Sequence, residues 1–398
     1  MYSEFKAYIG ILLCFLLAGV LLVGGIIYGC VTSNNDYYYE EFEEEIVYPV
    51  YYRAVSAQEG HALAINAEGI VVGWGSNADG QLGQVDNGFH RSYVTIGGVY
   101  DAVAVFGWRD FSGAIDSNGD VWIWGGNWEG RLALPNSTPT QLTNLKNVKY
   151  IWVNNRHFVV LLRNGDAYIR TIDGELEPLD LNIKTLSSGA AYMLFLTHDG
   201  EVYGIGDNSA GQLTANLPAS VSSPTRLPIE NVMAISASSL RAVALTTDGA
   251  LYQWGQVISF EQLDDGELVE FETIRTPARI ELFVYDPPYT DFIALAGGNN
   301  FTLAIRAGHR EIWGWGLNEL GVLGTYDMDS DIPYPSSLAY LHGVAEISAS
   351  GAYFIMLPGD GTLWMQGQMF GEELAGIRNT PALILENMMI VGENNYEI

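Results

Sequence analysis

The chain has 398 residues, of which 47 are acidic and 18 are basic, so its formal net charge is −29. A surface of this charge repels nucleic-acid phosphates and anionic lipid headgroups, which excludes a nucleic-acid partner. The two cysteines, Cys14 and Cys30, both lie near the N-terminus. The rest of the chain therefore needs no disulfide, and it is long enough to bury one large core.

The first segment with a clear pattern is an uncharged, apolar run over residues 7–29. About 20 such residues cross the hydrocarbon layer of a membrane as a helix. Lys6 precedes the run, and the next basic residue is Arg53. Because positive residues stay on the cytoplasmic side, we expect a membrane-anchored, single-pass protein with its large domain on the extracytoplasmic side.

Two interpretations of residues 1–30 remain open. The first is an uncleaved signal anchor, because the apolar run is longer than the core of a signal peptide, about 7–15 residues. The second is a lipoprotein signal, because residues 27–30 resemble a lipobox that ends in a lipidated Cys30. Tyr28 fits this motif poorly, since the motif prefers a small residue there. Residues 31–47 follow as an acidic tether that charge repulsion keeps extended.

Residues 48–398 repeat one pattern seven times. Each unit has an apolar strand, a turn with a glycine and a second strand that ends at a closing position, which is glycine in six units and Thr171 in the third. The closing glycines are Gly75, Gly125, Gly206, Gly255, Gly316 and Gly367. A unit of about 50 residues holds four strands, and radial repetition of such units gives a propeller. The sequence predicts an all-β fold, a seven-bladed β-propeller that follows one N-terminal transmembrane or signal helix.

The second strand and the loop after it resemble the regulator of chromosome condensation repeat. The loop half of the motif reads SNADGQLG at residues 76–83, GNWEGRLA at 126–133, DNSAGQLT at 207–214 and LNELGVLG at 317–324. The resemblance covers residues 48–398 and implies a seven-bladed propeller, here in a divergent, bacterial, membrane-tethered member. The family includes exchange factors for Ran, β-lactamase inhibitory proteins and ubiquitin-ligase modules, so the resemblance is specific for the fold and not for one function.

Alignment of the units places seven residues at one height, where a strand begins. They are His61, Phe111, His157, Tyr192, Arg241, Phe301 and Tyr353. We interpret them as caps of their own blades. The loops just before them hold the candidate binding residues, because loops on a rigid scaffold often carry recognition and Trp and Arg are enriched in interface hot spots. These candidates are Trp108, Arg109, Asp110, Arg156, Asn299 and Asn300.

The fifth unit departs most from the repeat. Residues 260–271 flank Asp264, Asp265 and Gly266, which is a strong hairpin signal. This acidic hairpin either lengthens the outer strands of its blade or forms an arm for a specific partner, which makes Asp264 and Asp265 further binding candidates. Nothing in it matches the wedge that Ran exchange factors use.

The sequence holds no catalytic motif of the common hydrolase, metalloprotease or phosphate-loop types. The six histidines lack metal-ligand spacing, so no metal site and no cofactor are predicted. The function expected is a non-enzymatic, membrane-tethered module that holds a protein or cell-envelope ligand on one propeller face. The alternative is an enzyme, of hydrolase or lyase type, with its site in the central channel. We also expect residues 388–391 to close the ring against the first blade.

Overall fold

The structure is a computed structural model. It describes residues 20–23, 26–33, 36–42, 52–126, 136–171, 175–263, 266–280, 291–318, 321–324, 331–338, 343–368 and 382–383. The chain divides into two compact units, Met1–Pro49 and Val50–Ile398.

The first unit contains a three-stranded antiparallel sheet in the order β1-β2-β3, formed by β1 (Val20–Val23), β2 (Ile26–Ser33) and β3 (Asp36–Phe42). Residues 20–23 and 26–29 are thus strands where the sequence predicts the end of a helix, and residues 7–19 lie outside the described residues. An apolar run rich in Val, Leu and Ile suits either state, so composition alone did not separate them. No helix among the described residues is long and apolar enough to cross a membrane.

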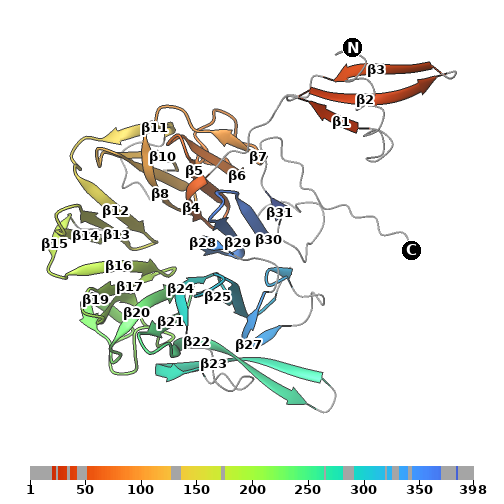
Figure 1. Cartoon of the computed structure of the whole chain (residues 1–398). Coiled ribbons are helices and arrows are strands. Elements are labelled where there is room, and N and C mark those ends of the chain that lie inside the picture. Colours follow the sequence, from red (N-terminus) through yellow and green to blue (C-terminus); the bar gives the residue numbers. More distant parts are fainter. Residues whose placement is uncertain are drawn as a thin grey trace. The chain divides into compact units, whose positions relative to one another are not determined.

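The second unit confirms the seven-bladed propeller, because its strands form seven four-stranded antiparallel sheets that follow one another around a ring (Figure 1). Blade 1 comprises β4 (Tyr52–Ala57), β5 (His61–Asn66), β6 (Val71–Ser76) and β7 (Phe89–Thr95). Blade 2 comprises β8 (Ala102–Trp108), β9 (Phe111–Asp116), β10 (Val121–Gly125) and β11 (Asn136–Leu142). Blade 3 comprises β12 (Val148–Val153), β13 (His157–Leu162), β14 (Ala167–Thr171) and β15 (Glu177–Leu179).

The remaining blades have the same order of strands. Blade 4 comprises β16 (Ile183–Ser188), β17 (Tyr192–Thr197), β18 (Val202–Asp207) and β19 (Ser220–Arg226). Blade 5 comprises β20 (Val232–Ala237), β21 (Arg241–Thr246), β22 (Leu251–Leu263) and β23 (Gly266–Arg279). Blade 6 comprises β24 (Phe292–Gly297), β25 (Phe301–Arg306), β26 (Ile312–Gly316) and β27 (Ile332–Ser337). Blade 7 comprises β28 (Val344–Ser350), β29 (Ala352–Pro358), β30 (Trp364–Gln368) and β31 (Ala382–Leu383).

The closing glycines are explained by the backbone. In blade 4, Gly206 ends the third strand's pairing with β17 and has a φ of 104°, a conformation that other residues avoid. A Cβ atom there would lie 2.4 Å from the carbonyl oxygen of Ala191, in the loop before β17. The third strand therefore passes this loop too closely for any side chain, and the same holds at Gly255, where the Cβ would lie 2.3 Å from the Leu240 carbonyl oxygen.

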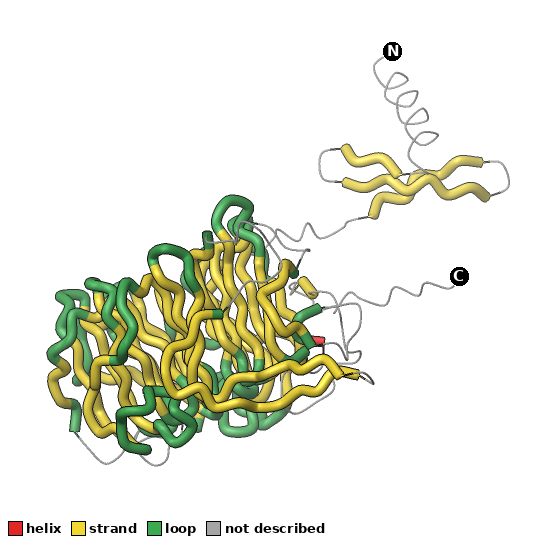
Figure 2. Tube along the Cα trace, turned by 90° about the horizontal axis from the view of Figure 1, so that it is seen from below, coloured by secondary structure: helices red, strands yellow, loops and turns green. Residues whose placement is uncertain are grey.

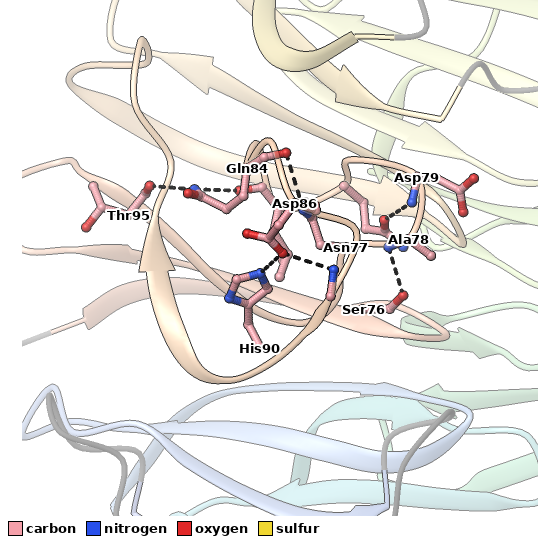
Figure 3. Close-up of polar contacts among 11 residues, drawn as sticks. Ser76, Asn77, Ala78, Asp79, Gln84, Asp86, His90 and Thr95 are labelled. Carbon is pink, nitrogen blue, oxygen red and sulfur yellow. Dashed lines mark hydrogen bonds and ion pairs between the residues drawn. The ribbon is translucent and has the colours of Figure 1, made fainter.

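The asparagine of the loop motif builds the turn around itself. In blade 1, Asn77 is fully buried, and its Oδ1 atom accepts a hydrogen bond of 2.8 Å from the Leu82 N–H. Its amide nitrogen donates to the carbonyl oxygens of Gln84 and Asp86. Figure 3 shows this loop, which is further held by the 2.8 Å contact between Asp86 and His90. Asn208 in blade 4 makes the matching bond of 2.8 Å to the Leu213 N–H.

The same loop also joins neighbouring blades. The Nε1 atom of Trp124 in blade 2 donates to the Gln81 carbonyl oxygen of blade 1 at 2.8 Å. Trp254 in blade 5 makes the equivalent 2.8 Å bond to the Gln212 carbonyl oxygen of blade 4. The glutamine loop and the Trp-Gly strand end of the repeat are thus two halves of one contact between successive blades.

The ring closes through side-chain packing between blades 1 and 7. Val55 and Trp74 of blade 1 share a buried cluster with Ile355 and Leu357 of blade 7. The Tyr353 hydroxyl lies 2.7 Å from the carbonyl oxygens of Gln58 and His61 and accepts a bond from the Gln58 N–H. Residues 388–391, which we expected at this seam, lie outside the described residues.

Candidate functional site

One face of the ring collects the loops that the sequence singles out. The strands of each blade run between two faces that carry the loops (Figure 2). The loops from first to second strand and from third to fourth strand lie together on one of them, which we call the mouth face. The short turns from second to third strand, such as residues 66–69, lie on the other, which we call the turn face.

The seven aligned residues lie just beneath the mouth face, as predicted, and all are at least 95% buried: His61, Phe111, His157, Tyr192, Arg241, Phe301 and Tyr353. Their role differs from the interpretation as caps of their own blades, because five of them contact the next blade: His61, Tyr192, Arg241, Phe301 and Tyr353. The Tyr192 hydroxyl donates to the Arg241 carbonyl oxygen at 2.6 Å, and the Arg241 guanidinium donates to the Thr302 hydroxyl at 2.6 Å. Sequence alignment gave their height but not the direction of the side chains.

Burial shifts the pKa values of these groups away from the range in which they could exchange protons near pH 7. Desolvation lowers the pKa of His61 to about 3 and that of His157 to about 4, so both imidazoles are neutral near pH 7. Desolvation also lowers the pKa of Arg241 to about 10 and raises that of Tyr192. These side chains are sealed inside the ring and serve packing rather than recognition.

The predicted loop residues are brought together from different blades on the mouth face. The half-buried Trp108 donates from Nε1 to the Asn155 side-chain oxygen at 3.0 Å, which links blades 2 and 3. The Arg109 guanidinium lies 3.3 Å from the Glu59 carboxylate of blade 1, and both side chains are about half exposed, 58% and 47%. Asn299 of blade 6 is exposed and lies 3.1 Å from the Ser239 hydroxyl of blade 5. These contacts join the loops of blades 1 to 3 and those of blades 5 and 6, and we call the exposed loops of the mouth face the rim.

The other three candidates divide into exposed and structural positions. Arg156 is exposed on the rim. Asp110 is half-buried, and its carbonyl oxygen accepts a 2.7 Å bond from the Gly126 N–H. The carbonyl oxygen of Asn300 accepts a bond from the Leu317 N–H, so Asn300 shapes the loop and offers little free surface.

The predicted hairpin of the fifth unit is confirmed. β22 and β23 pair with each other from Tyr252 opposite Arg279 to Leu263 opposite Gly266. β22 pairs with β21 only as far as Gly255, which lies opposite Arg241, the first residue of β21, and β22 continues beyond that point. As a connection from third to fourth strand, the hairpin begins at the mouth-face end of blade 5, and Figure 1 shows that it continues past the other strands of this blade. Residues 256–274 carry six acidic and no basic residues. Asp264 and Asp265 themselves lie outside the described residues.

Exposed apolar side chains add to this face. Phe271 in β23 is 52% exposed, and Leu240, in the loop just before β21, is 38% exposed. The Leu240 carbonyl oxygen accepts a 2.9 Å bond from the Gln256 N–H, so Leu240 lies at the base of the hairpin. The sequence analysis did not select Leu240. The pattern that could have indicated it is a large apolar residue in a loop that otherwise consists of serines.

The central channel, where the sequence placed the alternative enzyme site, contains a cavity of about 340 Å³ along the ring axis, whose lining was not predicted. Its wall contains residues of all seven innermost strands. A single strand cannot show this wall, because it exists only once seven strands are placed around one axis. In the part of the chain that the structure describes, no group of three or more His, Cys, Asp or Glu residues is placed to hold a metal ion.

Comparison with known proteins agrees with this fold. No family model matches the chain. The ultraviolet-B receptor UVR8 of Arabidopsis thaliana is 26% identical over 300 residues, which cover 68% of this chain and 66% of that protein. The chain therefore spans slightly less than two thirds of this relative's length.

Solved structures give the same result. The structure of Prp20p from Saccharomyces cerevisiae, described with its binding properties to Gsp1p and histones, matches with a TM-score of 0.60 at 20% identity and covers 75% of this chain and 80% of that one. Human WBSCR16 matches with a TM-score of 0.63 at 18% identity, over 81% of this chain and 89% of that one. At these identities the structures share the fold alone. The predicted bacterial origin stays a prediction.

Proposed function

We propose that this chain, which belongs to the regulator of chromosome condensation repeat family of seven-bladed β-propellers, is a non-enzymatic module that binds a protein through its mouth face. Prp20p, which shares the fold, is described with binding to the proteins Gsp1p and histones. The strong negative charge of this chain favours a partner with a basic surface and disfavours a nucleic acid.

The convergence of the rim loops is the observation that carries this proposal. Trp108, Arg109 and Asn299 come from blades 2 and 6, yet all lie on one exposed face of a rigid ring. Trp108 and Asn155 hold each other at 3.0 Å, so part of the rim is already ordered before a partner arrives. Such preorganisation lowers the entropic cost of binding. Phe271 and Leu240 supply apolar area at the same face.

The alternative, an enzyme with a site in the channel, has weaker support. The described residues that line the channel cavity include no Asp, Glu, His, Lys, Arg or Cys. General acid–base and nucleophilic catalysis rely mostly on these side chains.

We also propose that the first unit attaches the propeller to a membrane and leaves it on the extracytoplasmic side, either through residues 7–29 or through a lipid on Cys30. The uncharged run of residues 7–29 and the absence of basic residues between Lys6 and Arg53 support this. Metabolic labelling with a fatty acid separates the two routes. Label that disappears in Cys30→Ala supports the lipid, whereas a membrane-bound protein without label supports the helix. Recovery of the full chain in the aqueous fraction would contradict both.

The mouth face can be tested with photo-reactive residues. We expect a cross-linker at Arg109 to capture a defined partner protein from an extract of the source cells. A cross-linker at Arg226 is the matched control, because Arg226 is also an exposed arginine in an ion pair, with Glu201 and Glu230, but lies on the turn face. Equal or greater capture of the same protein from position 226 would contradict the proposal.

Affinity for the captured partner then identifies the contact residues. Trp108→Ala should weaken binding about thirtyfold, since loss of an aromatic anchor costs about 2 kcal/mol or more. Trp122→Ala is the control, because Trp122 is also half-buried and donates its Nε1 hydrogen to a side-chain oxygen, that of Asp116, on the turn face. Both variants must unfold at temperatures close to that of the parent chain for the comparison to count.

A further inference from the structure

The cavity on the ring axis has a defined wall. Its volume of about 340 Å³ lies at the lower end of the range of small-molecule pockets, about 300–1,000 Å³. Its lining includes Ser56 from β4, Trp152 from β12, Ser188 from β16 and Ser348 from β28. The cavity is therefore a property of the complete ring, and Trp108 and Asn299 of the rim form part of its wall.

The lining is chemically asymmetric. All its aromatic side chains come from blades 2 and 3: Phe106, Trp108, Tyr150 and Trp152. All its hydroxyl-bearing serines come from blades 1, 4, 5 and 7: Ser56, Ser187, Ser188, Ser238, Ser239, Ser348 and Ser350. The cavity thus has an aromatic side and a hydroxyl side, and a ligand inside it contacts both.

The aromatic side offers a surface for an apolar ring face. The rings of Tyr150 and Trp152 lie 5.5 Å apart, and Tyr150 is 43% exposed. An exposed aromatic ring inside a pocket binds the apolar face of a ligand by burial of area and keeps its own polar group free. The Lys149 ammonium lies 5.4 Å from the centre of the Tyr150 ring, outside the lining itself.

The hydroxyl side has hydrogen-bonding capacity that the protein does not use. The Ser188 hydroxyl oxygen is buried and has no hydrogen-bond partner among the described residues. The hydroxyls of Ser187 and Ser348 each accept one N–H, from Ala237 and Ala57 of the next blade, and each can still donate its own hydrogen. A buried polar group without a partner costs free energy, and rotation of the Ser188 side chain toward the cavity that this residue lines would let a ligand hydroxyl recover it.

From this lining we propose that the channel binds a small, neutral, polyhydroxylated molecule of about the size of a monosaccharide. The apolar face of its ring lies against Tyr150 and Trp152, and its hydroxyls bond to the serines of blades 4 and 7. A neutral ligand fits because no charged side chain lines the cavity within the described residues, so an ionic group there would lose hydration without a counter-charge. The channel site shares Trp108 and Asn299 with the rim, but its argument does not rest on partner binding at the mouth face.

The test uses the full chain in detergent and calorimetric titration with D-glucose, D-galactose and myo-inositol. We expect saturable binding of at least one of them with a Kd of about 1 mM or tighter. Glucose 6-phosphate and glucosamine should bind at least about tenfold more weakly than glucose, because each carries a charge into the uncharged lining. No saturable binding of any neutral probe, or equal binding of the charged ones, would overturn the proposal.

Two variants locate the site. Ser188→Ala should weaken binding about tenfold without loss of stability, because it removes an unpartnered buried hydroxyl. Tyr150→Leu should weaken binding by at least as much, since it removes the exposed ring. Ser222→Ala, an exposed serine in β19, is the matched control and should bind like the parent chain. Unchanged binding in both Ser188→Ala and Tyr150→Leu would place the sugar elsewhere and refute the channel site. Loss of sugar binding with intact partner capture at Arg109 would show that the two proposals stand separately.

Discussion

The tryptophans at the ends of the third strands differ in whether their Nε1 hydrogen has an acceptor. Trp254 is fully buried and bonded to the Gln212 carbonyl oxygen of the preceding blade. Trp315 is 3% exposed, but its Nε1 atom has no partner among the described residues. The blade before Trp315 is blade 5, where the long hairpin replaces the glutamine loop, so the acceptor carbonyl of the motif is missing there.

This difference predicts unequal costs for the same substitution. Trp254→Phe should destabilise the chain by about 1–2 kcal/mol more than Trp315→Phe, because only the first breaks a bond and leaves a buried carbonyl unpaired. The loss of side-chain volume is the same in both, so their difference isolates the hydrogen bond. Urea unfolding followed by tryptophan fluorescence and circular dichroism measures it. Equal costs would mean that the link between blades contributes nothing measurable.

Sequence analysis predicted the residues with a local signal and missed those whose role depends on the neighbouring blade. The closing glycines were visible because a positive φ demands glycine wherever the strand meets its own loop. The aligned ring from His61 to Tyr353 was found by its period. That Tyr192 bonds to blade 5 rather than to its own blade was not predictable, because the sequence of one blade contains no information on the rotation to the next.

At the scale of elements, the hairpin of β22 and β23 is the main departure from the repeat. The turn residues Asp264, Asp265 and Gly266 predicted it, since such turns match the twist of paired strands. Its length was also set by sequence, because residues suited to strands continue to Ile274 without a break. The face it joins follows from the strand order, because every connection from a third to a fourth strand lies on the mouth face.

The charge of the hairpin predicts a kinetic effect. Replacement of Asp264, Asp265 and Glu267 by the corresponding amides should slow association with a basic partner and flatten its salt dependence, while the dissociation rate changes little. The free energy of unfolding should change by less than about 0.5 kcal/mol, as is usual for surface substitutions. Stopped-flow association at several salt concentrations measures this.

A control with the same charge change separates the hairpin from the net charge. Glu68, Asp101 and Asp199 are exposed on the turn face, and their replacement by amides removes the same three negative charges. If both triple variants slow association equally, the overall charge and not the hairpin steers the partner. Faster dissociation in the hairpin variant alone would instead make the hairpin a direct contact.

At the scale of the whole molecule, the ring buries ionisable groups whose effects on stability oppose each other. Burial lowers the pKa of His61 to about 3 and of His157 to about 4, so the stability that both give above pH 6.5 is lost as the pH falls. Glu346 in β28 behaves in the opposite way. Burial raises its pKa to about 7, so it stabilises the fold below pH 4.5 and loses this effect as the pH rises to 7.

Between pH 7 and pH 4.5, His61 and His157 lower the free energy of unfolding and Glu346 raises it, each by on the order of 2 kcal/mol. The two histidines outweigh the one carboxyl, so the three groups together lower the stability over this interval. In Glu346→Gln the opposing contribution is gone, so the loss should be larger than in the parent chain. In His61→Gln one of the two downward contributions is gone, so the loss should be smaller. All other carboxylates titrate alike in the three proteins, so their effect drops out of the comparison.

Urea unfolding at pH 7.0, 5.75 and 4.5 tests this ordering. The decisive quantity is the change with pH in each variant, not its stability at one pH, because either substitution also alters packing. Glu346 lies where β28 meets the Val55 N–H of blade 1, and the pKa shift requires this seam to be closed. A Glu346→Gln variant with the same pH dependence as the parent chain would therefore mean that water reaches this carboxyl, and that the ring is open between its first and last blades.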